Sequence, residues 1–323
     1  MSAFFPEIFF QIFGNQDWAY YLLSQIFVII SFYYVFKLSK EIFKNALLGL
    51  ISVLILEAIY FYNFTTPEFN VNVCQLPFWS LTVYFSWKIF SNIEVNFSDC
   101  FFVGLFASIG FLSKYLFIYL LVSIDLLFIY LIFIKRDRKF DFKYLVTIEV
   151  FLIVLVPHLI WLSNNEFITI TYGLNRAELD QSSLANHFKF PLIFLLKQIG
   201  LLVPFIILVF LLVKKIKFKF NLKDKKLLFL LSINILPIML IFLTSVITGS
   251  KIRTMWMTPF YLFFGTLFVY LFKDQIDIKK LKNFIAGFIF LFFLSPILYA
   301  YISISKEDKR TDYPGKEIAI KTQ

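Results

Sequence analysis

Residues 115–134 read YLFIYLLVSIDLLFIYLIFI, an apolar run interrupted by one acid, Asp125. At a rise of about 1.5 Å per helical residue, a run of this length crosses the ~30 Å hydrocarbon core of a bilayer. The run is continuous rather than alternating between apolar and polar residues, which favours a helix over a barrel strand. Because 60% of the 323 residues are hydrophobic and the mean hydropathy is +0.80, we expect an all-α, polytopic transmembrane helical bundle.

Similar runs follow one another along the chain and predict about ten spans in one membrane domain. The predicted ranges are 19–38, 45–62, 72–90, 100–113, 115–134, 144–162, 192–213, 227–248, 257–272 and 284–304. We assign residues 1–18 to the end of an outer loop with a juxtamembrane helix and residues 19–304 to the transmembrane domain. Residues 305–323 are predicted to be an outer tail that opens a truncated domain.

Lys and Arg residues are distributed unevenly between the two sides of the predicted bundle. With the N-terminus outside, the inner loops carry about twice as many as the outer segments, as the positive-inside rule requires. The richest inner segments are KRDRKFDFK (135–143) and KKIKFKFNLKDKK (214–226). Attraction to inner-leaflet lipids explains these segments, so the net charge of +10 does not require a nucleic-acid partner. The expected partner is the lipid bilayer, and the expected location is a bacterial inner (plasma) membrane.

The outer segments collect acids, amides, aromatic residues and isolated basic residues, so we expect the active face to point outward. Glu68 follows Thr66 and Pro67 in an amide-rich turn. Its carboxylate either binds a metal or a sugar hydroxyl or acts as a base, or it stabilises the start of the next helix. Lys114 separates two apolar runs at the outer boundary, where it either holds a lipid phosphate or extends to the interface.

Two more outer segments carry candidate residues. PHLIWLSNNEF (157–167) contains His158, which is either a general base or a hydrogen-bonded structural residue. Trp161 in the same segment also fits an interfacial aromatic belt, and Arg176 lies in the loop that follows. KIRTMWMTP (251–259) contains Arg253 and Trp256. Its two cations form either an anion site, with phosphate or pyrophosphate as the natural ligand, or a pair extending to the interface.

Two charged residues fall inside predicted spans. Asp125 lies near the middle of its span and Lys197 lies within another. An unpaired charge at this depth costs several kcal/mol, so we expect a buried structural pair between the two, with a proton relay as the alternative. The sequence contains no Gly-rich phosphate loop and no nucleophile elbow.

Taken in order, these segments resemble the lipid-linked glycosyltransferases of the GT-C fold, which include the protein O-mannosyltransferases and the aminoarabinose transferases. The resemblance covers about residues 16–300. It rests on Thr66-Pro67-Glu68, Ser113-Lys114-Tyr115, Pro157-His158-Leu159-Ile160-Trp161, and Arg253 before Trp256–Pro259.

The resemblance implies that a sugar moves from a polyprenyl-phosphate carrier to a lipid, glycan or protein acceptor on the periplasmic, outer face. By this likeness Lys114 and Arg253 would hold the carrier phosphate. Glu68 would bind the sugar or a divalent cation, Mg²⁺ or Mn²⁺. The remaining candidate substrate-binding residues are Tyr115, His158, Trp161, Arg176 and Trp256.

The chain departs from the family pattern at its start. Residues 4–25, FFPEIFFQIFGNQDWAYYLLSQ, resemble the end of the first outer loop and the start of the family's second span. The usual first span and the acidic catalytic loop have no counterpart, which predicts an N-terminally truncated form. Asp17 and Glu7 are the remaining candidate bases. The alternative function is a non-catalytic polyprenyl-phosphate-binding or flippase-like protein. A secondary transporter fits less well, because the polar residues gather at one face rather than at the midplane.

Overall fold

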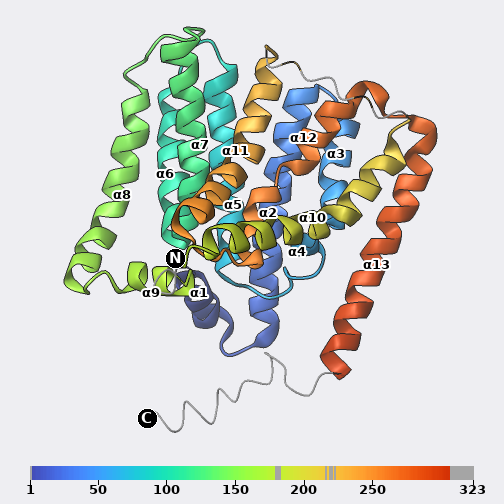
Figure 1. Ribbon diagram of the computed structural model, residues 1–323, viewed down its shortest axis with the longest axis horizontal. Coiled ribbons are helices and arrows are strands. Elements are labelled where there is room, and N and C mark those ends of the chain that lie inside the picture. The colour runs from blue at the N-terminus through green and yellow to red at the C-terminus, as the bar shows by residue number, and fades with distance from the viewer. Residues whose placement is uncertain (1, 179–182, 215–216, 218–220, 222, 306–323) are drawn as a thin grey trace.

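The computed structural model describes residues 2–178, 183–214, 217, 221 and 223–305, which form a bundle of helices (Figure 1). The predicted all-helical membrane fold is confirmed. Val213 and Ile276 pair in an isolated antiparallel bridge. The predicted tail lies outside the described residues from position 306 onward.

The elements differ widely in length, and the short 3₁₀ and π segments are labelled η. Their bounds are α1 Phe4–Phe13, α2 Asp17–Phe43, α3 Ala46–Leu54, η1 Ile55–Ala58, α4 Tyr60–Asn63, α5 Val71–Ser91, α6 Phe97–Ser113, η2 Tyr115–Phe117, α7 Ile118–Ile129, η3 Tyr130–Ile134, α8 Tyr144–Asn164, α9 Ile168–Arg176, α10 Asn186–Leu212, α11 Lys225–Thr248, η5 Thr254–Tyr261, α12 Phe264–Phe272, η6 Lys273–Gln275, η7 Ile278–Lys280 and α13 Leu281–Ser305.

Each predicted range falls on helical structure, and the ranges divide between long and short helices. Among the described residues, six helices are long and apolar enough to cross a membrane, and η5 with the α12–η6 helix makes a seventh if that pair, bent by 53°, counts as one span. The ranges 45–62 and 100–113 fall on shorter helices, the first of which is interrupted at Ile59, where the backbone is extended. The range 72–90 falls on α5, which has the length but carries polar residues along it.

Helix α5 is the central element of the bundle. It packs against α2, α6 and η5, and 17 of its 21 residues are buried. Asn70 caps its N-terminus by accepting hydrogen bonds from the backbone amides of Asn72 and Val73. The fully buried Trp79 ring lies 5.3 Å from the ring of Phe117 and 5.0 Å from that of Phe260. Aromatic packing of this kind fixes the interior of α5 relative to η2 and η5.

Two glycines allow neighbouring helices to approach closely. A Cβ atom on Gly104 of α6 would lie 2.5 Å from the carbonyl oxygen of Thr147 on α8, and one on Gly265 of α12 would lie 1.9 Å from that of Ser52 on α3. Small residues at such contacts are typical of helix packing in membranes.

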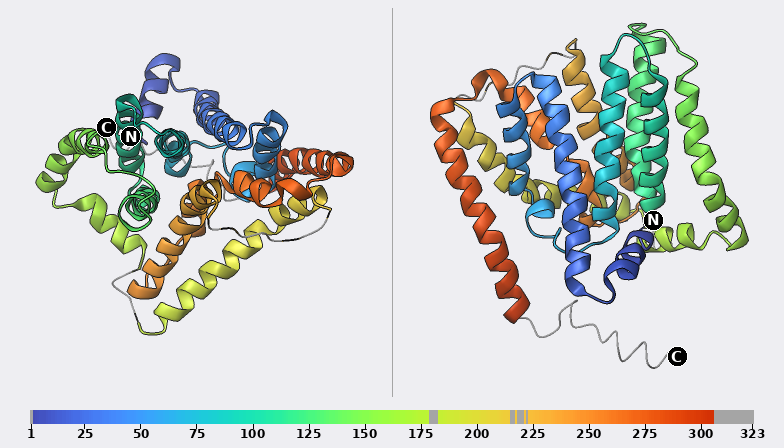
Figure 2. Two further views of the ribbon diagram at one scale, coloured as in Figure 1. Left: turned by 90° about the horizontal axis from the view of Figure 1, so that it is seen from above. Right: turned by 180° about the vertical axis from the view of Figure 1, so that it is seen from behind.

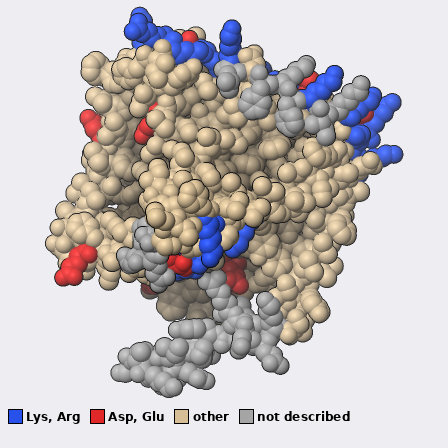
Figure 3. All heavy atoms as spheres, viewed as in Figure 1, with Lys and Arg blue, Asp and Glu red and all other residues tan. Residues whose placement is uncertain are grey.

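The two ends of the bundle differ in charge, and a row of Lys and Arg side chains marks the upper end in Figure 3. Several of these side chains stabilise neighbouring helix ends. Lys226 donates to the carbonyl of Ile42 at 2.6 Å, and Lys280 donates to that of Val213 at 2.7 Å. Cations at helix C-termini donate hydrogen bonds to the free carbonyls and interact favourably with the negative end of the helix dipole. We refer to this side as the basic end.

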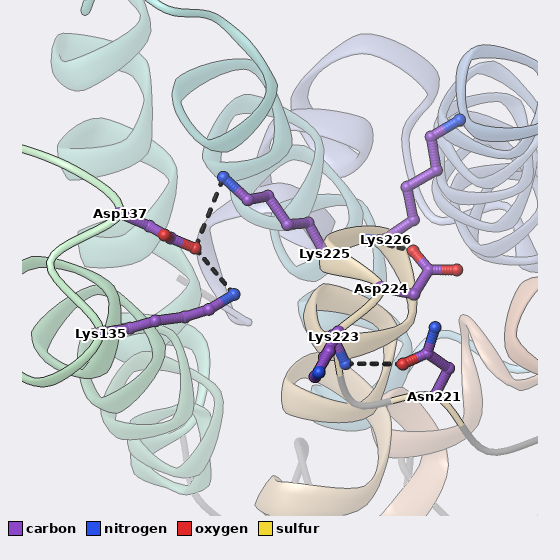
Figure 4. Close-up of polar contacts among 7 residues, drawn as sticks. All are labelled: Lys135, Asp137, Asn221, Lys223, Asp224, Lys225 and Lys226. Atoms are coloured by element: carbon purple, nitrogen blue, oxygen red, sulfur yellow. Dashed lines mark hydrogen bonds and ion pairs between the residues drawn. The ribbon is translucent and has the colours of Figure 1, made fainter.

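An ion-pair cluster joins two loops at the basic end. The Asp137 carboxylate lies 2.7 Å from the Lys135 ammonium and 3.5 Å from that of Lys225 (Figure 4). These neighbouring cations hold the pKa of the Asp137 carboxyl below its usual value. The opposite end carries α1 and α9, which lie outside the upright helices (Figure 1), while α10 runs obliquely across the bundle (Figure 2).

The predicted pair of Asp125 and Lys197 is wrong, because the ion pairs among the described residues do not include either side chain. Asp125 lies on α7, which packs against α11, whereas Lys197 lies on α10, which packs against α11 and α13. Both side chains are exposed on the outside of the bundle. Sequence position placed the two residues at a similar depth but did not show which faces of their helices point inward.

Candidate functional site

Lys114 lies at the break between two helices at the end opposite the basic end. Helix α6 ends at Ser113, Lys114 takes an extended conformation, and η2 begins at Tyr115. The Lys114 ammonium donates to the side-chain oxygen of Asn72 at 2.6 Å and lies 5.3 Å from the centre of the Trp256 ring. Burial, with a smaller contribution from the charge of Arg176, lowers the pKa of Lys114 to about 7. Its neighbours are thus an amide, an aromatic ring and a second cation.

Arg176 and Arg253 meet beside this lysine. Arg176 is the last residue of α9, and its backbone carbonyl accepts a hydrogen bond from Nε of Arg253 at 3.5 Å. The Arg176 guanidinium donates to the hydroxyl of Tyr172 at 2.7 Å. In the described part of the chain, neither arginine nor Lys114 forms an ion pair with a carboxylate. The structure therefore brings three predicted cations together without a compensating acid; we call Lys114, Arg176 and Arg253 the cation cluster.

The segment after α11 is attached to the end of α9 at further points. The backbone amide of Lys251 donates to the carbonyl of Ala177 at 2.8 Å, and its ammonium pairs with Glu178 at 2.7 Å. Trp256 follows in η5, where its amide donates to the carbonyl of Arg253 at 2.9 Å. These contacts fix the position of Arg253 and Trp256 relative to α9.

Tyr115 connects three elements beside the cation cluster. Its hydroxyl lies 2.7 Å from Nε2 of His158 on α8 and 2.7 Å from the hydroxyl of Thr169 on α9. The His158 ring stacks on Trp161 with 5.8 Å between ring centres. His158 is thus a hydrogen-bonded residue between a tyrosine and a tryptophan, which supports its structural interpretation over that of a free base.

Glu68 makes no hydrogen bond or ion pair with Lys114, Arg176 or Arg253 in the described part of the chain. Its Oε1 accepts a hydrogen bond from the hydroxyl of Tyr299 on α13 at 3.3 Å, and its backbone carbonyl accepts one from Asn70 at 3.1 Å. The loop before it is fixed to α2, since the Thr66 carbonyl accepts hydrogen bonds from Ser24 at 2.5 Å and Gln25 at 3.1 Å. Glu68 is therefore positioned by α2 and α13.

The residues present give limited support for a divalent cation. Mg²⁺ is commonly held by one or two carboxylates together with substrate phosphates. Glu68 offers one carboxylate that already accepts the Tyr299 hydroxyl, and no three His, Cys, Asp or Glu side chains among the described residues group as metal ligands. The Mg²⁺ or Mn²⁺ ion stays a prediction, and we derive no step through it.

The two candidate bases are not brought to the cation cluster by any hydrogen bond or ion pair of the described residues. The Glu7 carboxylate accepts a hydrogen bond from Gln11 on α1 at 2.7 Å and is exposed. Asp17 is the first residue of α2, where a negative charge is favourable at the positive end of the helix dipole. The catalytic base remains unassigned.

The comparison with known families concerns the N-terminal half of the chain. The family model for dolichyl-phosphate-mannose-protein mannosyltransferases matches residues 1–161. Over this stretch the chain is similar to that family. The predicted resemblance to lipid-linked glycosyltransferases is thereby confirmed. The family stretch contains Glu68, Lys114, Tyr115, His158 and Trp161, whereas Arg176, Arg253 and Trp256 lie beyond it. Comparisons with curated proteins and with solved structures gave no match.

Sequence reasoning missed several residues that complete the site. Asn72 holds the Lys114 ammonium, Thr169 holds Tyr115, and Tyr299 contacts Glu68. The amide-rich turn at residues 63–72 was a signal for Asn72. Thr169 and Tyr299 carried no signal, because their roles depend on the packing of α9 and α13 against distant elements.

Proposed function

We propose that this protein transfers a sugar from a polyprenyl-phosphate carrier to an acceptor at the end of the bundle that carries the cation cluster, and that this end faces outward. Similarity to the family supports the coarser part of the proposal, a membrane glycosyltransferase with a lipid-linked sugar donor. The positive-inside rule supports the orientation, since the basic end belongs on the cytoplasmic side. The acceptor is a lipid, a glycan or a protein.

The observation that carries the proposal is the convergence of three cations without a paired carboxylate among the described residues. Lys114, Arg176 and Arg253 come from three distant segments of the chain. Mutual repulsion makes such a cluster unfavourable unless an anion joins it. The phosphate of a polyprenyl carrier supplies that anion, because its headgroup lies at the membrane boundary where Lys114 is located.

The reaction that fits this cluster is a direct displacement. An acceptor oxygen attacks the anomeric carbon of the sugar while the bond from that carbon to the phosphate oxygen breaks, and the bonding electrons leave with the phosphate. The cation cluster stabilises the negative charge that develops on the departing phosphate. The acceptor proton passes to a base, and Glu68 is proposed to bind the sugar.

Binding of undecaprenyl phosphate to the full chain in detergent tests the phosphate site. Lys114→Met removes a charge-assisted hydrogen bond to the phosphate, so we expect affinity to fall about tenfold or more. Lys189→Met is the matched control, because Lys189 is an exposed cation on α10 at the same end. Equal affinities of Lys114→Met and the unmodified protein would contradict the proposal.

The second candidate function is a non-catalytic polyprenyl-phosphate-binding or flippase-like protein. It is favoured by one observation, that Glu7 and Asp17 make no hydrogen bond or ion pair with the cation cluster. Glu68→Ala separates the two functions. A transferase should lose sugar transfer and keep carrier binding, whereas a flippase should keep its activity.

A further inference from the structure

A cavity with both polar and apolar lining residues lies at the basic end, far from the cation cluster. Its volume is about 220 Å³, and it is partly open, lying between the start of α3 and the turns that lead into α13. Asn45, Lys273 and Asp277 contribute its polar lining, and leucine and isoleucine side chains of α3, η7 and α13 contribute the rest. The cavity is therefore amphipathic, with a cation on one wall.

Lys273 lines this cavity, Lys44 directly precedes its lining residue Asn45, and Lys226 interacts electrostatically with both lysines. Lys44 caps the C-terminus of α2 and directly precedes Asn45. The Lys226 ammonium lies 2.6 Å from the carbonyl of Ile42, two residues before Lys44. Lys273 lines the cavity, with its ammonium 4.0 Å from the centre of the Tyr270 ring. Lys44 and Lys273 both repel Lys226 electrostatically, so the three form one group, which we call the inner lysine group.

These lysines lack ion-pair partners in the described residues, in contrast to their neighbour Lys225, which pairs with Asp137. In Figure 4 Lys225 points towards Asp137, whereas Lys226 extends the other way. An anion that enters the cavity therefore meets the Lys273 ammonium, which forms no ion pair with a carboxylate of the described chain, although Asp277 belongs to the same lining.

The nearby acids are mostly engaged elsewhere. Asp224 caps the first backbone amides of α11, and its other oxygen accepts the Tyr270 hydroxyl at 2.6 Å. Asp277 accepts a hydrogen bond from the backbone amide of Lys279 at 2.9 Å. Asp274 is exposed on η6 and forms no ion pair with a described residue. Asp224 and Asp277 act on backbone amides at helix starts, and the Asp224 charge also attracts Lys226 and partly offsets its repulsion from Lys44 and Lys273.

We propose that this cavity binds the phosphodiester headgroup of an anionic phospholipid from the leaflet at the basic end. Basic pockets between membrane helices on this side are suited to such headgroups. The surroundings favour a lipid over a free anion, because Leu47, Leu50 and Ile278 expose apolar surface beside the cavity. The headgroup would contact Lys44 and Lys273, while the acyl chains would cover these apolar side chains.

This inference is independent of the proposed function. The inner lysine group lies at the opposite end of the helices from Lys114, and none of its members belongs to the site for the sugar carrier. An experiment can therefore refute carrier binding without refuting headgroup binding, and it can refute headgroup binding without refuting carrier binding.

Native mass spectrometry of the full chain, extracted from vesicles with equal amounts of phosphatidylglycerol and phosphatidylcholine, tests the inference. We expect selective retention of phosphatidylglycerol by the unmodified protein. In a variant that combines Lys44→Gln with Lys273→Gln, the preference for phosphatidylglycerol over phosphatidylcholine should fall about tenfold. The reason is that each lysine near the membrane surface adds to the attraction for anionic lipid. Lys44→Gln alone should give part of this loss; its exposed side chain makes the variant least disruptive to the fold.

Lys139→Gln is the matched control, since it removes the same charge from an exposed site at the same end, in the 135–143 loop. An equal loss in this control would overturn the inference, because the preference would then reflect the overall charge of the basic end. The same holds if the unmodified protein retains both lipids equally. Stabilisation by inorganic phosphate alone, to the extent produced by phosphatidylglycerol, would also contradict a lipid site.

Discussion

If Lys114 binds the carrier phosphate as proposed, we expect the affinity for the carrier to depend on pH. Burial and Arg176 lower its pKa from 10.5 to about 7. An ammonium group with this pKa loses its charge as pH rises through about 7, and its attraction for a phosphate is lost with the charge. The phosphate itself gains charge over the same range, since its second pKa is about 6. The contribution of Lys114 must therefore be measured against a cation that does not titrate.

Lys114→Arg provides that comparison, because the guanidinium stays protonated. We expect the affinity of the unmodified protein for undecaprenyl phosphate to fall relative to Lys114→Arg between about pH 6 and pH 8. Parallel binding curves would show that Lys114 keeps its charge. The sign for stability is the reverse: above about pH 7 the unfolded chain holds a proton that the folded chain has released, so stability rises with pH up to about 10.

Tyr115 is predicted to position α9 rather than to take part in chemistry. Tyr115→Phe removes the hydroxyl that joins His158 and Thr169. The expected cost is about 1 kcal/mol of stability, together with weaker carrier binding as Arg176 on α9 becomes less fixed. Thermal unfolding and undecaprenyl phosphate binding measure the two effects.

His158→Gln separates positioning from base catalysis. If His158 only anchors Tyr115, this variant should resemble Tyr115→Phe in both binding and sugar transfer. A complete loss of transfer with unchanged carrier binding would instead identify His158 as the base.

At the scale of elements, the start of α11 depends on one residue. Asp224 caps the amides of Lys226 and Leu227 and also accepts the Tyr270 hydroxyl. Asp224→Ala should lower the free energy of unfolding by about 1–2 kcal/mol, as for other N-cap losses. Asp274→Ala, at an exposed acid on η6, should have little effect. Equal shifts in the unfolding temperature of both variants would contradict a capping role.

The positions of the long helices could be predicted from sequence, and their partners could not. Apolar runs located the long helices, because backbone hydrogen bonds must be satisfied within each span, whereas α9 falls in a segment predicted to be a loop, which is wrong. The face that a helix buries depends on its neighbours, and the two intramembrane charges show the consequence. Asp125 and Lys197 both point outward, although apolar surroundings alone favoured a buried pair.

The candidate site, like the fold, could be predicted in part: the cations were identified from sequence, but not all of their contacts. Isolated cations on the acid- and aromatic-rich side of the chain indicated an anion site, and Lys114, Arg176 and Arg253 do converge. Glu68 is predicted to bind the sugar or a divalent cation beside them, and that role stays a prediction. Its contact with Tyr299 of α13 could not be predicted, because α13 is close to α4 and η1 in space, a proximity that sequence separation hides.

At the scale of the whole molecule, the stretch that matches the family should not fold alone. A chain that ends after residue 161 lacks η5, whose Phe260 packs on Trp79, and lacks α11, whose Phe229 packs on Trp87 at 5.1 Å. We expect this fragment to be degraded or to unfold well below the full chain, as measured by limited proteolysis in detergent. A fragment as resistant as the full chain would show that α2, α5 and α6 form a self-sufficient core.

The burial of α5 also has a consequence for biogenesis. Helix α5 carries Gln75, Thr82 and Ser86, each of which leaves a side-chain oxygen without a partner among the described residues. Insertion of this helix into lipid without its neighbours would therefore release little free energy. Its covering element η5 is synthesised after some 160 further residues. During that interval α5 must be sheltered by α2 and α6, by the translocation machinery or by an insertion chaperone. The order of synthesis therefore delays the centre of this protein in reaching its final surroundings until most of the chain has been made.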